Sequence, residues 1–309
     1  MRILVTGTNG FIGGHLVRKL ETEGNDVVRL IRGAAASTAP SVFSGPERLA
    51  DLERSGPWPE GIEAVVHLAA RISSGRDGTA PDVFESNVEG TRALAKRARA
   101  EGVKRIVFLS TANVHGLGRD APYSEDDPLD PPSPYARSKK AAEEAFWDAL
   151  GDDKDRGTVL RPPPVYGKGG HGRVAALVKL AKLPLPLPLK GLGAPRSVIA
   201  VDHLAGIISL CLRSDAARGG TFLVADDEPV RPEDIVAAVR QGLKRPASLV
   251  PAPVVLARSI ARMAGLGDAW RLRTLPCLLD TTLLKTRLGW TSPASTVETI
   301  RRMATTGEI

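Results

Sequence analysis

One tyrosine and one lysine stand four residues apart in a stretch with helical composition. The pair is Tyr135 and Lys139 in YARSKKAAEEAFWDAL, and side chains four residues apart share one face of a helix. A phenol with its ordinary pKa of about 10 is a poor base at neutral pH. Because a neighbouring ammonium stabilises the phenolate, the spacing indicates proton-transfer chemistry centred on Tyr135.

Two hydroxyl residues lie upstream of this pair, where a predicted strand ends. They are Ser110 and Thr111 in the segment LSTANVHG at 109–116. In a parallel sheet, side chains at the carboxyl end of a strand face the ligand crevice. We therefore expect Thr111 to hydrogen-bond a substrate oxygen, with Ser110 as the alternative donor. The alternative role for both is a cap at the strand end.

A glycine-rich loop follows the first predicted strand. In TGTNGFIGGHL, Gly7, Gly10 and Gly13 have the spacing GxxGxxG between a strand and a helix. Gly7 permits a tight turn, Gly10 lets the backbone approach a pyrophosphate, and Gly13 allows the helix to pack closely on the sheet. The position of the loop predicts dinucleotide binding.

The end of the second predicted strand bears on which dinucleotide binds. An acidic residue there would accept a hydrogen bond from the ribose of NAD, but this chain has Arg32. A guanidinium can neutralise a 2′-phosphate instead, which favours NADP. Arg32 as a solvated surface residue is the alternative. Asp51 and Leu52 are candidates for the adenine pocket, or else ordinary loop residues.

The order of the predicted elements indicates the fold class. Short β-branched runs alternate with helical stretches up to about residue 165, which predicts an α/β fold with a doubly wound parallel sheet of the Rossmann type. Proline and glycine then become frequent, which predicts a smaller C-terminal substrate-binding lobe. We expect a dinucleotide-binding domain over 1–165, and over 166–309 mainly the lobe, with some segments returning to the first domain. The predicted strands are 3–6, 27–31, 64–68, 106–109, 158–160 and 221–224, and the predicted helices begin near 11, 82 and 135 and span 173–182, 201–213 and 232–242.

Composition excludes several classes of protein. The formal charge of +7 over 309 residues comes from dispersed basic residues without a long run, so we expect no nucleic-acid partner. No apolar stretch approaches the roughly 20 residues of a membrane span, so we expect no membrane partner. The two cysteines, Cys211 and Cys277, have no metal-ligand spacing, so we expect no metal. The opening MRILVTG leads directly into a strand without an export signal, so we expect a cytoplasmic protein.

Eight short motifs, spread over nearly the whole chain, form one specific pattern. They are TGTNGFIG, HLAA at 67–70, NVEGT at 87–91, LSTANVHG, YARSK, RPPPVYG at 161–167, RSVIAVDHL at 196–204 and LGW at 288–290. With these motifs the chain resembles the extended short-chain dehydrogenase/reductases. Within them it is similar to the branch of nucleotide-sugar epimerases, dehydratases and reductases.

The resemblance implies NAD or NADP as cofactor and assigns roles at the reacting centre. Tyr135 would be the acid/base, Lys139 would lower its pKa and hold the nicotinamide ribose, and Thr111 would polarise the reacting oxygen. Asn87 would lie beside the cofactor. The expected cofactor contacts are Gly7, Gly10, Phe11, Ile12, Gly13, Arg32, Asp51, Leu52, Leu68, Ala69, Ala70, Asn87, Ser110, Tyr135, Lys139 and Pro162.

The resemblance also implies a nucleotide-diphosphate sugar as substrate and a homodimer. Arg196 would clamp the diphosphate through bidentate bonds. Arg271 or Arg273 would add a second clamp, with a surface charge as the alternative role for each. The expected substrate contacts are Thr111, Asn113, Tyr135, Arg196, Arg271 and Arg273. Dimers of the family form through the two helices near 85–100 and 135–150.

Members of this branch share hydride exchange, usually at C4 of the sugar, and differ in the subsequent chemical steps. The 4,6-dehydratases carry an Asp-Glu pair after the threonine, whereas this chain has Ala112 and Asn113, which argues against dehydration. Pro164 and His115 replace residues of familiar UDP-glucose 4-epimerases. These replacements argue against simple galactose epimerisation. RPPPVYG, followed by PLPL and RSVIAVDHL, resembles members that act on UDP-N-acetylhexosamine-type sugars in cell-surface polysaccharide synthesis. We expect a 4-epimerase of a UDP-hexose or UDP-N-acetylhexosamine. The alternatives are an NADPH-dependent UDP-4-keto-sugar reductase in surface polysaccharide synthesis and a non-catalytic dinucleotide sensor.

Overall fold

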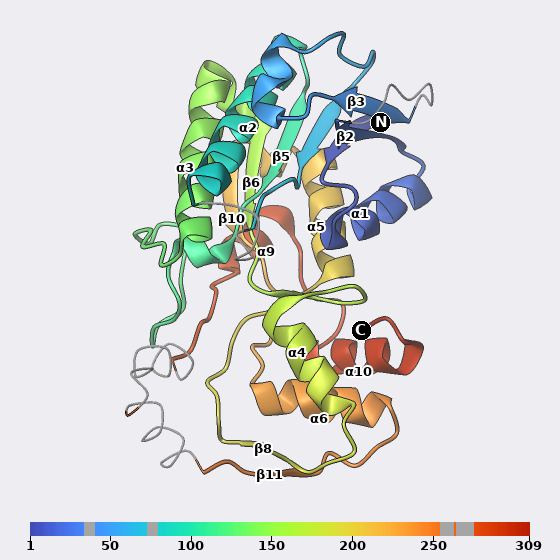
Figure 1. Ribbon diagram of the computed structural model, residues 1–309, viewed down its shortest axis with the longest axis vertical. Helices are drawn as coiled ribbons and strands as arrows, with labels where there is room; N and C mark the ends of the chain where they lie inside the picture. Colours follow the sequence, from blue (N-terminus) through green and yellow to red (C-terminus); the bar gives the residue numbers. More distant parts are fainter. Residues whose placement is uncertain (34–40, 73–79, 254–262, 264–274) are drawn as a thin grey trace.

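A parallel sheet of seven strands forms the centre of the larger part of the molecule (Figure 1). The structure is a computed structural model that describes residues 1–33, 41–72, 80–253, 263 and 275–309. The strand order is β10-β6-β5-β4-β1-β2-β3, which confirms the predicted α/β fold of the Rossmann type. The strands are β1 (Arg2–Thr6), β2 (Asp26–Arg32), β3 (Val42–Gly45), β4 (Ala64–His67), β5 (Arg105–Leu109), β6 (Gly157–Arg161) and β10 (Gly220–Leu223).

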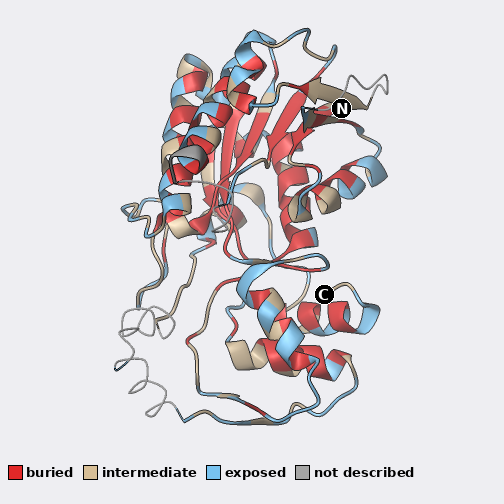
Figure 2. Ribbon diagram, viewed as in Figure 1, coloured by how far each residue is buried: buried red, intermediate tan, exposed pale blue. Residues whose placement is uncertain are grey.

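Helices cover both faces of the sheet, so its strands are buried on both sides (Figure 2). Helices α1 (Phe11–Thr22) and α5 (Val201–Arg213) cover one face, where Ile3 and Val5 of β1 point. Helices α2 (Ala80–Ala100) and α3 (Pro134–Leu150) pack against each other on the opposite face, where Leu4 points. The alternation along β1 is the two-residue period of a strand, and it separates two apolar cores.

A smaller lobe lies beyond the carboxyl ends of the strands (Figure 1). It has a core of its own, in which α4, α6 and α10 pack together. Helix α9 packs against β10 of the main sheet, so the chain returns to the larger part after residue 166. The remaining elements are η1 (Leu49–Arg54), η2 (Ala112–Val114), η3 (Gly151–Arg156), β7 (Val165–Tyr166), α4 (Gly172–Ala181), β8 (Leu187–Lys190), β9 (Ile199–Ala200), η4 (Asp215–Ala217), α6 (Pro232–Gly242), β11 (Leu249–Pro251), α9 (Thr282–Leu288) and α10 (Thr296–Thr306).

The order of the strands fixes where a ligand crevice forms. The chain winds from β1 through β2 to β3 in one direction and from β4 through β5 to β6 in the other, so the order reverses between β1 and β4. The register places Thr6 beside His67, and His67 beside Phe108. The carboxyl ends of β1, β4 and β5 are therefore level, and the loops that follow them share one edge. Among the described residues, no helix is long and apolar enough to cross a bilayer.

The close approach of α1 to the glycine loop gives a first prediction. A Cβ at Gly13 would lie 2.1 Å from the carbonyl oxygen of Gly7 and 2.8 Å from the Cα of Thr8. Gly13→Ala must therefore displace the loop, and we expect a loss of about 2 kcal/mol or more in the free energy of unfolding together with loss of dinucleotide binding. Chemical denaturation and dinucleotide titration measure the two effects.

Gly14→Ala is the matched control, one residue further along the same helix. Its nearest neighbours to an added Cβ are Arg18 at 3.9 Å and the Thr8 carbonyl at 4.0 Å, so there is room for a methyl group. Alanine is the better helix former, and we expect this variant to be more stable by up to about 1 kcal/mol and to bind dinucleotide normally. Equal behaviour of the two variants would contradict the packing argument.

Candidate active site

The glycine loop joins β1 to α1 and lies against the segment after β4. Gly7 has a φ of +73°, and a Cβ on it would lie 2.8 Å from the backbone nitrogen of Ala69. The backbone N–H of Gly10 donates to the carbonyl of Gly7 at 3.0 Å, which closes the turn, and Gly10 caps α1. Phe11 and Ile12 form the first turn of that helix, and both are half-buried. A tight turn at a helix N-terminus, packed this closely on the sheet, is the arrangement that receives a pyrophosphate.

The residues predicted for the adenosine end lie near β2 and η1. Arg32 is the last residue of β2 and is exposed, and β2 is the neighbour of the glycine-loop strand. Asp51 is exposed in η1. Leu52 is fully buried among the side chains between the sheet and α2, so its side chain belongs to the core.

The segment after β4 is held by Asn87 of α2. The side-chain oxygen of Asn87 accepts the backbone N–H of Arg71 at 2.7 Å, and its nitrogen donates to the Arg71 carbonyl at 3.0 Å. The same nitrogen donates to the hydroxyl of Ser138 on α3 at 2.9 Å. The hydrogen bonds of Asn87 thus connect the segment containing Leu68, Ala69 and Ala70 to α3.

The hydroxyl residues at the end of β5 have different partners. The hydroxyl of Ser110 donates to the buried carboxylate of Glu143 on α3. Thr111 is buried and caps η2, since its hydroxyl oxygen accepts the backbone N–H of Asn113 at 3.3 Å. The carbonyl of Pro162 accepts the backbone N–H of Ala112 at 2.8 Å, which brings the segment after β6 to the same place. Because Ser110 donates its hydroxyl hydrogen to Glu143 whereas Thr111 uses only its oxygen, the hydroxyl hydrogen of Thr111 can still be donated to a substrate.

The sequence determines where α3 begins and so where the predicted pair lies. Ser133 caps the helix by accepting the backbone N–H of Ala136 at 3.1 Å, and Pro134 occupies the first turn. Tyr135 is therefore in the first turn, and Lys139 follows one turn later on the same face. Because η2 contacts α3, this face meets the segment that contains Thr111.

The amine of Lys139 is buried against an aromatic ring. Lys139 is 2% exposed, and its Nζ lies 4.1 Å from the centre of the Phe108 ring, a distance at which a cation is attracted to the ring. Burial lowers the pKa of Lys139 to about 7, and the carboxylate of Glu143 opposes this effect. The amine can therefore exchange its proton near neutral pH.

Burial also acts on Tyr135, against the lowering of its pKa that the spacing predicts. Burial raises the pKa of Tyr135 to about 12 although part of the residue is exposed, so the effect of Lys139 on the phenol stays a prediction. Removal from water disfavours the charged form of both side chains. The spacing indicated an attraction between them but gave no measure of their burial.

A buried ion pair lies one turn beyond Lys139. Glu143 and Arg161 are 4% and 7% exposed, and Nη2 of Arg161 donates to Glu143 at 2.6 Å. Nη1 of Arg161 lies 3.0 Å from Nε2 of His115, and Ser110 also donates to Glu143. Because Arg161 ends β6 and Ser110 follows β5, the pair fixes α3 to the ends of both strands.

Sequence reasoning did not find this ion pair. The available signal was spacing, since Glu143 follows Tyr135 and Lys139 at the same interval of four residues and so lies on the same face. Arg161 opens the motif RPPPVYG, but its side chain reaches Glu143 only because β6 and α3 pack together. A single sequence does not give that contact.

Arg196, the predicted diphosphate clamp, lies between two loops. It pairs with Val230 on one side and Cys277 on the other through isolated backbone bridges. Its guanidinium donates to the carbonyls of Leu117 and Leu275, each at 3.3 Å, and burial lowers its pKa. Arg271 and Arg273, the other predicted clamps, lie outside the described residues.

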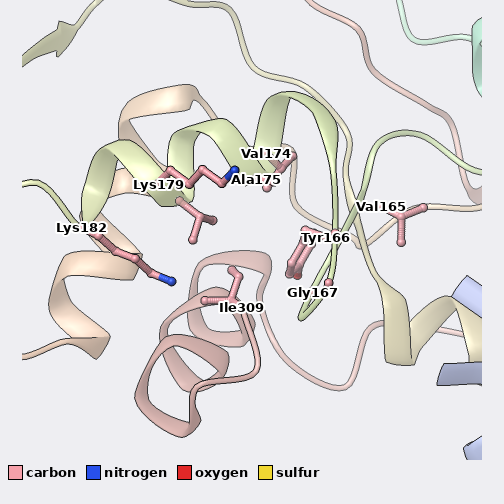
Figure 3. Close-up of a pocket in the computed structure, with 11 residues that line it drawn as sticks. Val165, Tyr166, Gly167, Val174, Ala175, Lys179, Lys182 and Ile309 are labelled. Carbon is pink, nitrogen blue, oxygen red and sulfur yellow. The ribbon is translucent and has the colours of Figure 1, made fainter. Parts of the chain in front are cut away.

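A separate cavity of about 150 Å³ lies in the smaller lobe (Figure 3). Its walls come from β7, α4 and the loop at 167–170, and the amines of Lys179 and Lys182 are on α4 and just after it. None of the residues that line it is among the predicted catalytic residues. The cavity is therefore separate from the residues predicted to react at the edge of the sheet.

A Rossmann sheet whose glycine loop shares an edge with a tyrosine–lysine helix defines a class, the nicotinamide-dependent enzymes of the extended short-chain type. Residues 3–225 match the model of the NAD dependent epimerase/dehydratase family. The chain belongs to this family.

Known relatives agree with this assignment. The chain is 29% identical to the UDP-glucose 4-epimerase of Vibrio cholerae over 98% of its own length and 94% of the relative. Its fold is similar to that of the UDP-N-acetylglucosamine 4-epimerase of Bacillus cereus, with a TM-score of 0.77, 18% identity and 98% of each chain covered. It is also similar to RMD of Pseudomonas aeruginosa complexed with NADPH, with a TM-score of 0.72, 21% identity and 98% and 97% of the two chains covered.

The buried ion pair gives a second prediction. Glu143→Gln keeps the shape of the side chain but leaves the guanidinium of Arg161 buried without a counter-charge. We expect a loss of about 3 kcal/mol in the free energy of unfolding, measured by chemical denaturation. Glu144→Gln, at the exposed neighbouring position, is the control and should change stability by less than about 0.5 kcal/mol. A similar small loss in both variants would show that the pair is not a structural support.

The lowered pKa of Lys139 gives a third prediction. The amine holds its proton less well in the folded chain than in the unfolded one, with a pKa of about 7 against 10.5. Between these values the unfolded chain binds more protons, so stability must rise with pH, and below about 7 the full penalty applies. Without added cofactor at pH about 7, Lys139→Met should therefore have a free energy of unfolding higher than the wild type by on the order of 3 kcal/mol, and should unfold at a higher temperature.

The pH dependence is the control for this variant. The advantage of Lys139→Met should shrink as the pH rises from about 7 towards 10, because the folded amine is then neutral and the cost of removing the proton from the unfolded amine falls as the pH approaches 10.5. Thermal scans at several pH values measure it. A variant less stable than the wild type across this whole range would contradict the account of the buried amine.

Proposed function

We propose that the protein exchanges hydride at C4 of a nucleotide-activated hexose, as a 4-epimerase of a UDP-hexose or UDP-N-acetylhexosamine. The observation that carries the proposal is the contact of α3, which bears Tyr135 and Lys139, with η2, which Thr111 caps. The names of the similar proteins, a UDP-glucose 4-epimerase and a UDP-N-acetylglucosamine 4-epimerase, support this choice of substrate.

The residues at the crevice fit a nicotinamide dinucleotide. Cβ atoms at Gly7 and Gly13 would meet backbone at 2.8 Å and 2.1 Å, so the glycine loop forms a cradle that only glycine permits. The loop and the first turn of α1 would hold the pyrophosphate, and the segment containing Leu68, Ala69 and Ala70 would lie beside it. When bound, the nicotinamide supplies the hydride acceptor and donor.

The proposed catalytic pair transfers the proton of the sugar hydroxyl. As its phenolate, Tyr135 takes the proton of the sugar hydroxyl as hydride leaves the same carbon, and returns it in the reverse step. Thr111 donates its hydroxyl hydrogen to the reacting oxygen. Because burial raises the pKa of Tyr135 to about 12, the phenol must lose its own proton before it can act as this base. The proposed role of Lys139, in its protonated form, is to stabilise the phenolate.

The substrate's diphosphate would be held from the side of the smaller lobe. Arg196 precedes β9 and bridges to Val230 and Cys277, and its charge suits a diphosphate. We therefore propose that residues 166–309 mainly bind substrate, apart from α5, β10 and α9, which pack with the dinucleotide-binding part.

A 4-keto-sugar reductase is the second candidate, and one observation favours it. Arg32 ends β2 and is exposed beside the strand of the glycine loop, where the 2′-phosphate of NADP would lie. RMD, a similar structure, is complexed with NADPH. A reductase needs a cofactor that exchanges after each turnover, whereas an epimerase returns hydride to the sugar and needs no exchange.

We also propose a homodimer through α2 and α3. The two helices pack side by side on one face of the sheet, so their outer surfaces together form one layer (Figure 1). Phe84 on α2 is 45% exposed, which suits a partner surface.

The fourth prediction tests the proposed reaction. The purified protein is mixed with a panel of UDP-hexoses, UDP-N-acetylhexosamines and a UDP-4-keto sugar, while sugar isomers and NADPH oxidation are followed. A changed isomer ratio without net oxidation identifies an epimerase, and stoichiometric oxidation identifies a reductase. Tyr135→Phe should lower kcat by about a thousandfold, because the proton has no acceptor.

Tyr166→Phe is the matched control. The hydroxyl of Tyr166 donates to Asp226 at 2.7 Å in a buried cluster that contains none of the predicted catalytic residues, so its loss should lower stability and leave kcat within about twofold. Unchanged turnover in Tyr135→Phe would contradict the proposed chemistry. Dinucleotide binding without turnover of any sugar in the panel would favour a non-catalytic sensor.

A further inference from the structure

A buried histidine lies between the glycine-loop strand and the catalytic helix. His67 is the last residue of β4 and is 2% exposed. The register places it between Thr6 of β1 and Phe108 of β5, and all three side chains lie on the face covered by α2 and α3. The predicted reaction gives this side chain no role.

The hydrogen bonds around His67 determine its tautomer. The hydroxyl of Thr91 donates to the carbonyl of Asn87 at 2.6 Å, so its oxygen must accept from Nε2 of His67, which lies 3.0 Å away. Nε2 therefore carries the hydrogen. Burial and the nearby charge of Lys139 lower the pKa of His67 to about 3, so the ring is neutral and Nδ1 is an acceptor.

The Nδ1 side of the ring supports the glycine loop. Nδ1 lies 2.8 Å from the hydroxyl of Thr6, which must donate to it. The oxygen of Thr6 accepts the backbone N–H of Ala69 at 3.1 Å. Thr6 directly precedes Gly7, and Gly7 packs on the backbone of Ala69, so this arm fixes both sides of the predicted cofactor cradle.

The Nε2 side of the ring leads to the catalytic helix. From Thr91 the bonds continue through Asn87 on α2 to the hydroxyl of Ser138, which donates to the carbonyl of Tyr135 at 2.8 Å. The ring of His67 also stacks on the ring of Phe108, with 5.3 Å between the ring centres, and the amine of Lys139 lies over the same Phe108 ring. The bonds from this ring therefore reach the backbone of Tyr135, and its stacking partner contacts the amine of Lys139.

We propose that His67 is a positioning residue whose two ring nitrogens hold separate parts of the site, Nδ1 the cofactor loop and Nε2 the helix of Tyr135 and Lys139. The second arm rests on the proposed function, since it concerns turnover. The first arm concerns dinucleotide binding and the structure of the crevice, and it holds for any reaction at this site.

Two substitutions separate the arms, and they form the fifth prediction. The amide of His67→Asn can take the place of Nδ1 and keep the hydrogen bond with Thr6, but it does not reach Thr91. The amide of His67→Gln can take the place of Nε2 and keep the hydrogen bond with Thr91, but the hydrogen bond with Thr6 is lost. We expect His67→Gln to weaken dinucleotide binding about tenfold with kcat at saturating cofactor within about twofold. His67→Asn should do the reverse, with kcat lower by about tenfold and binding nearly unchanged.

Thr158→Val is the control for loss of a buried threonine hydroxyl. Thr158 of β6 donates to the carbonyl of Ala217 at 2.8 Å, on the face of the sheet opposite His67. Its substitution should lower stability without changing dinucleotide affinity or kcat. Thr6→Val should repeat the effect of His67→Gln, and Thr91→Val that of His67→Asn. Nitrogen NMR of His67 should show a neutral ring with hydrogen on Nε2 from pH about 5 to 8.

Several outcomes would overturn the proposal. The first is that both His67 variants lose dinucleotide affinity and kcat to the same extent. The second is that both variants lose stability while dinucleotide affinity and kcat stay unchanged. A third is a ring that titrates near its ordinary pKa of about 6.5. Lack of sugar turnover in the wild type would contradict the proposed function alone, because dinucleotide binding and the NMR spectrum are measured without sugar.

Discussion

The burial of the Lys139 amine is the constraint on which the rest of the site depends. An amine taken from water loses hydration, and here the compensating groups are the face of Phe108 and the carboxylate of Glu143. Each of these needs its own support. Phe108 stacks between His67 and Phe146, and Glu143 is held by Arg161 and Ser110. The fold therefore surrounds one poorly solvated charge with groups whose positions are fixed by two strands and two helices.

The register of the sheet explains how so many polar groups meet under one helix. Thr6, His67 and Phe108 are neighbours across β1, β4 and β5, and each is at or next to the carboxyl end of its strand. A shift of one residue in any strand would turn these side chains to the face of α1 and α5. The glycine loop packs β1 against the segment after β4, so the loop and the helix of Tyr135 and Lys139 depend on the same strand pairing.

Much of this could be predicted from the sequence, because it depends on local patterns. The strand-to-helix alternation predicts the Rossmann sheet, the glycine spacing predicts the loop, and Tyr135 and Lys139 are found from their spacing and the helical stretch that contains them. Burial could not be predicted in the same way. Burial raises the pKa of Tyr135, and the pairs Glu143–Arg161 and His67–Thr91 join residues far apart in the chain.

The most direct measurement is the titration of the Lys139 amine itself. NMR of the side chain, assigned by comparison with Lys139→Met, gives its pKa in the folded protein without added cofactor. A midpoint close to 7 is the expected result, since burial outweighs the attraction of Glu143. A midpoint above about 10, the ordinary range of a solvated lysine, would contradict the account, because the amine would then be neither dehydrated nor supported by the groups around it.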